Sequence, residues 1–160
     1  MMRPFYEQKE HRDSENAIAE EIANLKGLGH VKFPLGATVD RALVDGEGTV
    51  KALLEIKTRT TPIAKYPTYC CSEERMATYR LIAQRLKVPA LLAVRWTDAT
   101  GIIDVRRAPF LRLVEQGGRF DRNDPKDIEP MIHWAINAFW IVPSAADSGK
   151  RQEGKRREKQ

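Results

Sequence analysis

The sequence predicts an α/β fold in which helices pack on a central mixed β-sheet. Three observations support this class: apolar residues at helical spacing near the N-terminus, a pair of strand-like segments around a glycine-rich turn, and a second helical pattern that leads into short apolar runs. With 160 residues, of which 42% are hydrophobic, the chain is long enough to bury a core of its own.

The first element is a helix, expected from Asp13 to Lys26. Asp13 or Ser14 is the expected N-cap, and Gly27 is the expected stop. The apolar stripe that this helix would bury consists of Ile18, Ile22 and Leu25.

A β-hairpin is expected next, with strands at Thr38–Val44 and Thr49–Lys57. If two residues close the turn between them, Asp40 lies opposite Leu53. The preceding short apolar run, residues 31–35, leads into this hairpin.

The segment Thr58–Cys71 has no clear periodicity, and so long a connection in a small domain is often functional. A second helix follows, with Ser72 as its N-cap and Pro89 beyond its end. Further strands are expected at Ala90–Trp96, Ile102–Arg107 and Met131–Ile136.

The second hairpin strand carries the residues of most chemical interest. Glu55 and Lys57 share one face because side chains alternate along a strand, and the expected register brings Asp40 to the same side. Charged residues on a hairpin are usually a solvated surface. Leu53 on the same face argues that the face is covered, and buried charges need partners or a metal.

Two carboxylates and one ammonium group suit phosphodiester hydrolysis. Carboxylate oxygens hold Mg²⁺ or Mn²⁺, and the bound cation polarises a phosphate and acidifies water. A lysine beside the cation can orient or help to deprotonate the attacking water and can offset negative charge that develops on the phosphate.

The motif resembles the PD-(D/E)XK nuclease superfamily, with its restriction-endonuclease-like fold. Asp40 is followed fifteen positions later by Glu55-Ile56-Lys57, although Val39 stands where the motif has proline. The resemblance covers roughly residues 13 to 108 and is nearest to small phage-encoded and repair-associated members, including the VRR-NUC branch and Holliday-junction resolvases. It implies that Asp40, Glu55 and the carbonyl of Ile56 ligate the metal and that Lys57 is catalytic.

The same resemblance implies a glutamate on the first helix that faces the metal. Glu15 is the candidate, because it lies about 40° from the centre of the apolar stripe at roughly 100° per residue. It would bind through water or a second ion. Glu21 is a weaker candidate, and Glu20 points away.

Two arginines are candidates for binding the substrate. Arg59 lies on the Lys57 face if the strand continues, and Arg75 lies near the start of the second helix. Each could hold a phosphate through its planar guanidinium group or could form a structural ion pair. The segment 117–130 is expected to form a structured turn, because it does not fit a calcium-binding EF-hand loop.

Several classes of site are excluded by composition. The two cysteines, Cys70 and Cys71, are neighbours and lack zinc-ligand spacing, and no apolar run approaches the roughly 18 residues of a membrane span. The start of the chain lacks the apolar region of a signal peptide, so a cytoplasmic location is expected. The apolar stretch 138–142 is a candidate surface for a homodimer.

Together these observations predict one nuclease domain over residues 1–145 and a basic tail over 146–160. The expected function is a divalent-metal-dependent endonuclease that acts on DNA, structure-selective for branches or junctions, in phage replication, recombination or repair. The alternative is a non-catalytic nucleic-acid-binding or assembly protein that keeps the nuclease fold. A hydrolase of small phosphorylated molecules ranks last, because no phosphate-binding glycine loop is present.

The tail gives the first testable prediction. Residues 150–160 carry +4 of the net charge of +5, so their deletion is expected to preserve folding and catalysis, to weaken DNA binding and to reduce its salt dependence. DNA affinity measured across a salt series checks this. An unchanged slope would identify the tail as a solvated end, which its composition equally allows.

Overall fold

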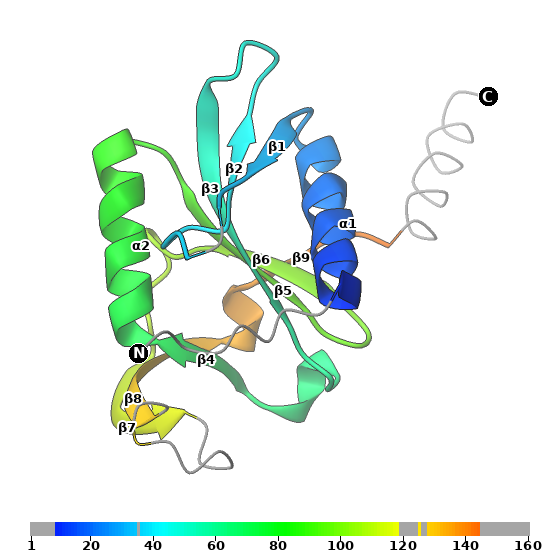
Figure 1. Cartoon of the computed structure of the whole chain (residues 1–160). Coiled ribbons are helices and arrows are strands. Elements are labelled where there is room, and N and C mark those ends of the chain that lie inside the picture. The colour runs from blue at the N-terminus through cyan, green and yellow to red at the C-terminus, as the bar shows by residue number, and fades with distance from the viewer. Residues whose placement is uncertain (1–8, 35, 119–124, 126–127, 145–160) are drawn as a thin grey trace, which may run out of the picture.

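The computed structural model describes residues 9–34, 36–118, 125 and 128–144 (Figure 1). Its main sheet has six strands in the order β1-β2-β3-β5-β6-β9, and a second sheet has the order β4-β8-β7. β3 and β5 are parallel, whereas the other neighbours in both sheets are antiparallel. The predicted α/β class with a central mixed sheet is therefore confirmed. The elements are α1 (Lys9–Leu25), β1 (Gly29–Lys32), β2 (Arg41–Val44), β3 (Val50–Thr58), β4 (Thr68–Ser72), α2 (Glu73–Leu86), β5 (Ala90–Arg95), β6 (Thr100–Asp104), β7 (Arg112–Gly118), β8 (Ile128–Ala135) and β9 (Trp140–Ile141).

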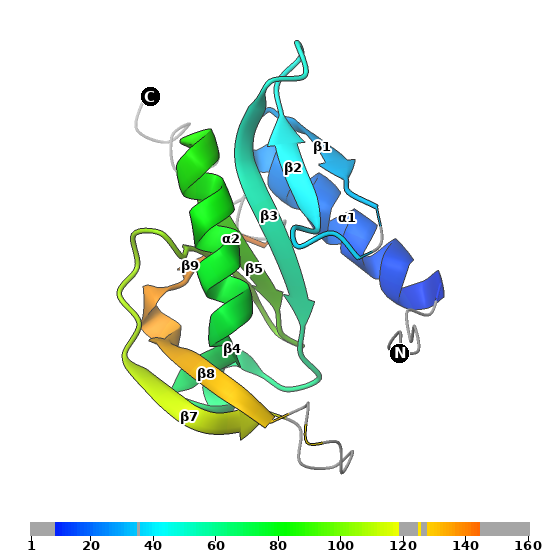
Figure 2. The ribbon, with the colours of Figure 1, turned by 60° about the vertical axis from the view of Figure 1, so that its left-hand side comes forward.

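The two helices cover opposite faces of the main sheet, as Figures 1 and 2 both show. The buried face of α1 packs on the even-numbered residues of β3, in a core that includes Ile18, Ile22, Leu54 and Ile56. The other core lies beneath α2 and also receives the second sheet; its members include Leu53, Met76, Tyr79, Leu92 and Trp134. β3 is therefore buried on both faces, because a helix closes each side.

Helix α1 begins earlier than predicted. It starts at Lys9, so the expected caps Asp13 and Ser14 lie inside the helix. The polar residues that precede them contain no helix breaker, and the N-cap rule alone could not place the first turn. Its end is as expected, because Gly27 has a φ of +65°, which favours glycine.

The register of the hairpin differs from the prediction by two residues. Ala42, rather than Asp40, pairs with Leu53, and the register shifts between Leu43 and Val44. The turn is longer than two residues because the Asp45 carboxylate accepts hydrogen bonds from the backbone N–H groups of Glu47 and Thr49. A shift of two keeps every side chain on its predicted face.

The segment Thr58–Cys71 contains a strand that the sequence did not reveal. β4 pairs with β8, with Tyr69 opposite Trp134, and β7 forms the far edge of this second sheet. At the start of α2, the predicted N-cap is confirmed, since the hydroxyl of Ser72 accepts a hydrogen bond from the backbone N–H of Arg75.

Some expectations concern residues outside the described part of the chain. The basic tail, 146–160, and the middle of the 117–130 segment, 119–124 and 126–127, are among them. The ends of that segment belong to the antiparallel strands β7 and β8. Within the described ranges, no helix has the length and apolar character needed to cross a membrane.

Gly101 provides a test of the packing between β6 and the segment around Phe139. A Cβ atom there would lie 3.0 Å from Phe139 Cβ and 3.1 Å from Trp96 Cζ3, whereas nothing lies within 4 Å of one added at Gly46. Gly101→Ala is expected to lower the free energy of unfolding by about 1–3 kcal/mol, because the core is already full. Gly46→Ala, the matched control, should change it by less than about 0.5 kcal/mol. Urea denaturation of both variants measures the difference, and equal stabilities would contradict this packing.

Candidate active site

The site is built around Glu55, a carboxylate in the middle of a buried strand. Only 1% of its side chain is exposed, and Lys57 Nζ lies 2.7 Å from its Oε1. The predicted alternation of β3 is confirmed, because Leu53 on the same face belongs to the core beneath α2. The expectation that this face is covered is therefore correct.

Asp40 approaches Glu55 from the neighbouring chain segment. It directly precedes β2, whose first pair is Arg41 with Leu54, so continuing the register sets Asp40 across from Glu55. Its carbonyl accepts a hydrogen bond of 2.9 Å from the N–H of Phe33, which ties this residue to the end of β1. The corrected register thus brings Asp40 nearer to Glu55 than the predicted one.

The electrostatics of the site confirm this proximity. Burial raises the pKa of the Glu55 carboxyl, the Lys57 ammonium opposes that rise, and the Asp40 carboxylate adds to it. A carboxylate among apolar residues is costly to ionise, and a second one beside it increases the cost. Both effects favour the protonated form of the Glu55 carboxyl.

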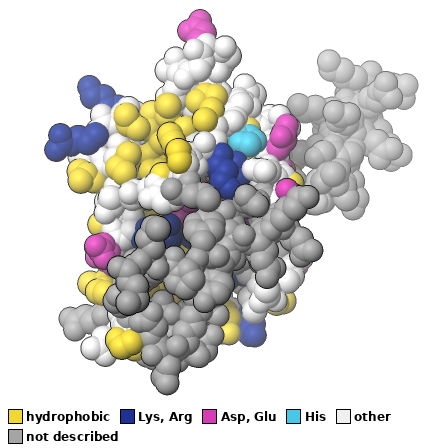
Figure 3. Space-filling view, in the orientation of Figure 1, with side chains coloured by type: hydrophobic (Ala, Val, Ile, Leu, Met, Phe, Trp, Pro, Cys, Tyr) yellow, Lys and Arg dark blue, Asp and Glu magenta, His cyan; other side chains and the backbone are white. Residues whose placement is uncertain are grey.

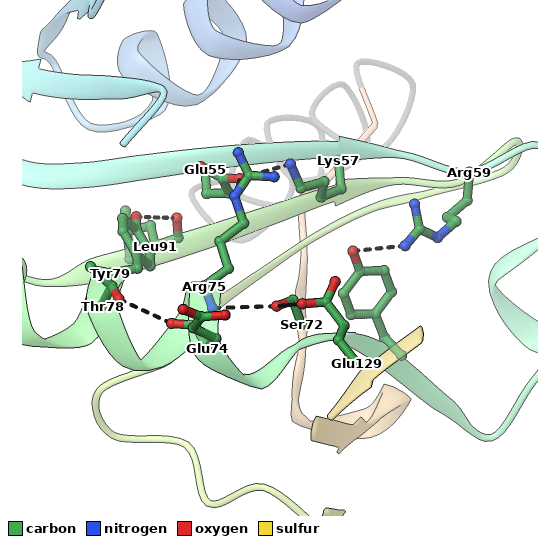
Figure 4. A network of polar contacts seen from close by, with 11 residues as sticks. Glu55, Lys57, Arg59, Ser72, Glu74, Arg75, Thr78, Tyr79, Leu91 and Glu129 are labelled. Carbon is green, nitrogen blue, oxygen red and sulfur yellow. Dashed lines mark hydrogen bonds and ion pairs between the residues drawn. The ribbon is translucent and has the colours of Figure 1, made fainter. Parts of the chain in front are cut away.

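A pocket of about 290 Å³ opens beside these residues and is lined by Glu15, Asp40, Lys57 and Arg75, with the β1–β2 connection as its wall. The predicted inward turn of Glu15 is correct. Arg75 extends from the first turn of α2, and its Nε lies 3.8 Å from Glu55 Oε1 (Figure 4). Figure 3 shows acidic and basic side chains set back near the centre of this face, below apolar side chains that gather over α2, β2 and β3.

The residues present fit a divalent cation. Both oxygens of Glu55 are buried; Oε1 is paired with Lys57, Asp40 lies near, and Oε2 has no N–H donor among the described residues. Unsatisfied carboxylate oxygens are ligands that Mg²⁺ and Mn²⁺ prefer, and water commonly completes their shell. Within the described ranges no three His, Cys, Asp or Glu side chains gather as a ready-made site. Glu15 lines the pocket without completing such a group.

Comparison with known proteins identifies the family of the chain. Residues 1–142 match the model of a family described as "Phage putative PDDEXK endonuclease". The chain belongs to this family. Among solved structures, it is similar to Hjc, a Holliday junction resolvase from the archaeal hyperthermophile Archaeoglobus fulgidus, with a TM-score of 0.49 and 10% identity over 79% of this chain and 90% of that one. No curated protein matches the chain.

The remaining predicted residues of this PDDEXK chain lie apart from the pocket. Arg59 donates a hydrogen bond of 3.0 Å to the hydroxyl of Tyr69, and its guanidinium carbon lies 4.8 Å from the centre of that ring. It lines a different pocket. The side chain of Ile56 is buried on the α1 face of the sheet, and the role of its carbonyl stays a prediction.

Two residues of the site were not found from the sequence. Glu129 accepts a hydrogen bond of 2.7 Å from Ser72, the N-cap of α2, and so links β8 to the helix that carries Arg75 (Figure 4). Tyr79 lies about one turn further along α2 than Arg75. Its hydroxyl donates a hydrogen bond of 2.8 Å to the carbonyl of Leu91, and burial raises the pKa of this hydroxyl. Their partners are distant in sequence, so no local pattern could identify them.

The raised pKa of Glu55 predicts how stability depends on pH. Above about its ordinary value of 4.5 the unfolded chain releases the proton that the folded protein still holds. The free energy of unfolding therefore falls as pH rises from 4.5 to the folded pKa. Glu55→Gln removes the cost of ionising this buried carboxyl. In EDTA, the free energy of unfolding of this variant, relative to that of the unchanged protein, should therefore increase as pH rises through that range.

Thermal denaturation of both proteins across the pH series makes this measurement. At neutral pH, Mn²⁺ should raise the Tm of the unchanged protein and not that of Glu55→Gln, because the cation binds the folded carboxylates. A stability difference that is constant with pH would show that Glu55 titrates normally.

Proposed function

We propose that this protein is a divalent-metal-dependent endonuclease that hydrolyses phosphodiester bonds in DNA. The observation that carries the proposal is the buried Glu55, which has Asp40 beside it, an ion pair between its Oε1 and Lys57, and no N–H donor to its Oε2 among the described residues. A purely structural carboxylate so deeply buried would be expected to accept hydrogen bonds at both oxygens. A carboxylate that binds a cation would keep an oxygen available for it.

In this proposal Asp40, Glu55 and the carbonyl of Ile56 hold Mg²⁺ or Mn²⁺, and Glu15 contributes through water or a second ion. The bound cation would polarise the scissile phosphate and acidify a water molecule. The two carboxylates fix its place between β2 and β3. The pocket that Glu15 and Asp40 line is where the phosphate would enter.

Lys57 acts on the water and the phosphate. Its side chain is 27% exposed and lines the pocket while its ammonium stays paired with Glu55. From there it orients the attacking water and offsets the negative charge that develops on the phosphate. Arg75, half exposed on the opposite wall, binds a phosphate oxygen through its planar guanidinium group.

We further propose selectivity for branched DNA or junctions, in phage replication, recombination or repair. The described elements are the two sheets, the two α-helices and two short 3₁₀ helices, so that part of the chain holds no separate module for recognising base sequence. A nuclease of this kind would select its substrate by DNA structure.

Lys57→Ala is expected to lower the cleavage rate by about a hundredfold or more, because the loss of one group that stabilises the developing negative charge costs about that much. Mn²⁺ affinity should be nearly unchanged, since Lys57 is not a ligand. Lys51→Ala is the matched control, because Lys51 lies on the same strand and pairs with Asp45 at the hairpin end. Cleavage of junction and linear DNA with Mg²⁺, together with Mn²⁺ titration, tests both statements. Unchanged turnover would favour the alternative, a binding protein that keeps the nuclease fold.

We also propose a homodimer formed through β9. Phe139 and Val142 are buried, whereas Trp140 and Ile141, on the edge strand, are 54% and 44% exposed. Large apolar side chains on an unpaired edge favour self-association. Trp140→Glu should dissociate the dimer in sedimentation equilibrium, whereas Leu86→Glu, at an exposed position on α2, should not. A monomer at every concentration would contradict the proposal.

A further inference from the structure

A second pocket, of about 410 Å³, lies beyond the end of β3. Its volume falls in the range of roughly 300–1,000 Å³ that is typical of sites for small organic groups. The described interactions of the active site do not use it. Residues that line it include Arg59, Tyr66, Thr68, Tyr69, Trp96 and His133.

The pocket is adjacent to the active site along one strand. Arg59 follows Lys57 by two residues, about 7 Å at the rise of a β-strand. β3 and β5 are parallel, so their carboxyl ends, which lead into Arg59 and Trp96, meet at one edge of the sheet, where α/β folds place ligands. Burial raises the pKa of the Cys71 thiol to about 12, and the Lys57 and Arg59 cations both oppose this rise, so both lie near that side chain.

The walls of the pocket combine aromatic rings with hydrogen-bonding groups. Tyr66 is 57% exposed, so part of its ring surface is accessible to an incoming group. Tyr69 and Trp96 meet edge to face, with ring centres 6.1 Å apart. Thr68 Oγ1 lies 3.0 Å from His133 Nδ1, so this wall of the pocket also contains a polar pair. Aromatic faces with a few polar atoms are the surroundings in which proteins hold unstacked bases.

The cations around the pocket suit a nucleic-acid backbone. Arg59 is exposed and lines this pocket, two residues along the chain from Lys57, which lines the other pocket, so a phosphate next to the scissile one could reach it. Lys65 Nζ lies 5.4 Å from the centre of the Tyr66 ring, so a second positive charge flanks the aromatic face. A strand held by Lys57 and Arg59 would therefore direct a base toward Tyr66.

We propose that this pocket receives one unpaired base of the DNA strand, next to the phosphate that is cut. The inference rests on the proposed nuclease function and gives its structure selectivity a physical basis. A base in an intact duplex must leave its stack and its pairing partner, which costs free energy. A base in a bulge, flap or branch point has already lost them.

The test uses two duplexes that carry 2-aminopurine, one with the fluorescent base as a single-nucleotide bulge and one with it paired. Binding in EDTA is followed by anisotropy and by 2-aminopurine fluorescence, so no cleavage is needed. The unchanged protein should bind the bulged duplex about tenfold more tightly, the size of one base–aromatic stacking contact. Tyr66→Ala should remove most of this preference and leave affinity for the paired duplex unchanged.

Two variants serve as controls. Tyr66→Phe keeps the ring and should keep the preference, and Phe110→Ala removes an exposed ring elsewhere, 46% exposed, and should also keep it. Equal affinity of the unchanged protein for both duplexes overturns the proposal, as does a preference that survives Tyr66→Ala combined with Thr68→Val.

Adding Mg²⁺ separates this inference from the nuclease proposal. A preference for binding the bulged duplex, without cleavage of either duplex, supports the base-binding pocket and refutes the proposed nuclease function. Cleavage of both duplexes, together with equal affinity for them, refutes the base-binding pocket and supports the nuclease function.

Discussion

The burial of Glu55 is the constraint on which the rest of this structure depends. Its strand is covered by α1 on one face and α2 on the other, so the carboxylate lies where water cannot solvate it. An isolated charge in such a place would be strongly destabilising. Lys57 Nζ at 2.7 Å and Arg75 Nε at 3.8 Å from Glu55 Oε1 offset this cost, whereas the negative charge of Asp40 adds to it. Three elements from different parts of the chain thus converge on one side chain.

The second sheet contributes to this convergence through the start of α2. Ser72 ends β4, caps α2 and donates a hydrogen bond to Glu129 of β8. Arg75 lies one turn further along the helix, so its direction toward Glu55 depends on contacts that β4 and β8 make. The small sheet is therefore part of the site's support as well as the wall of the neighbouring pocket.

How far the sequence predicted this arrangement depends on the range of each interaction. The shared face of Glu55 and Lys57 and the inward turn of Glu15 follow from periodicities of 2.0 and 3.6 residues, and both were predicted correctly. The hairpin register was wrong because the Asp45 carboxylate holds a longer turn. β4 could not be identified, since its stability comes from pairing with β8, about sixty residues away. Arg59 lies one residue beyond the end of β3, and its contact with Tyr69 depends on that unseen sheet.

The double burial of β3 also determines how much variation this strand can tolerate. From Ala52 to Ile56 every side chain is buried, with alternate residues facing α1 and α2. On the α1 side a change of volume disturbs close packing, and on the α2 side it disturbs Glu55 or the core beside it. Substitution is therefore restricted along the whole central segment, whatever the role of each residue in chemistry. Gly46 and Glu47, in the exposed turn at the other end of the hairpin, are under no such restriction.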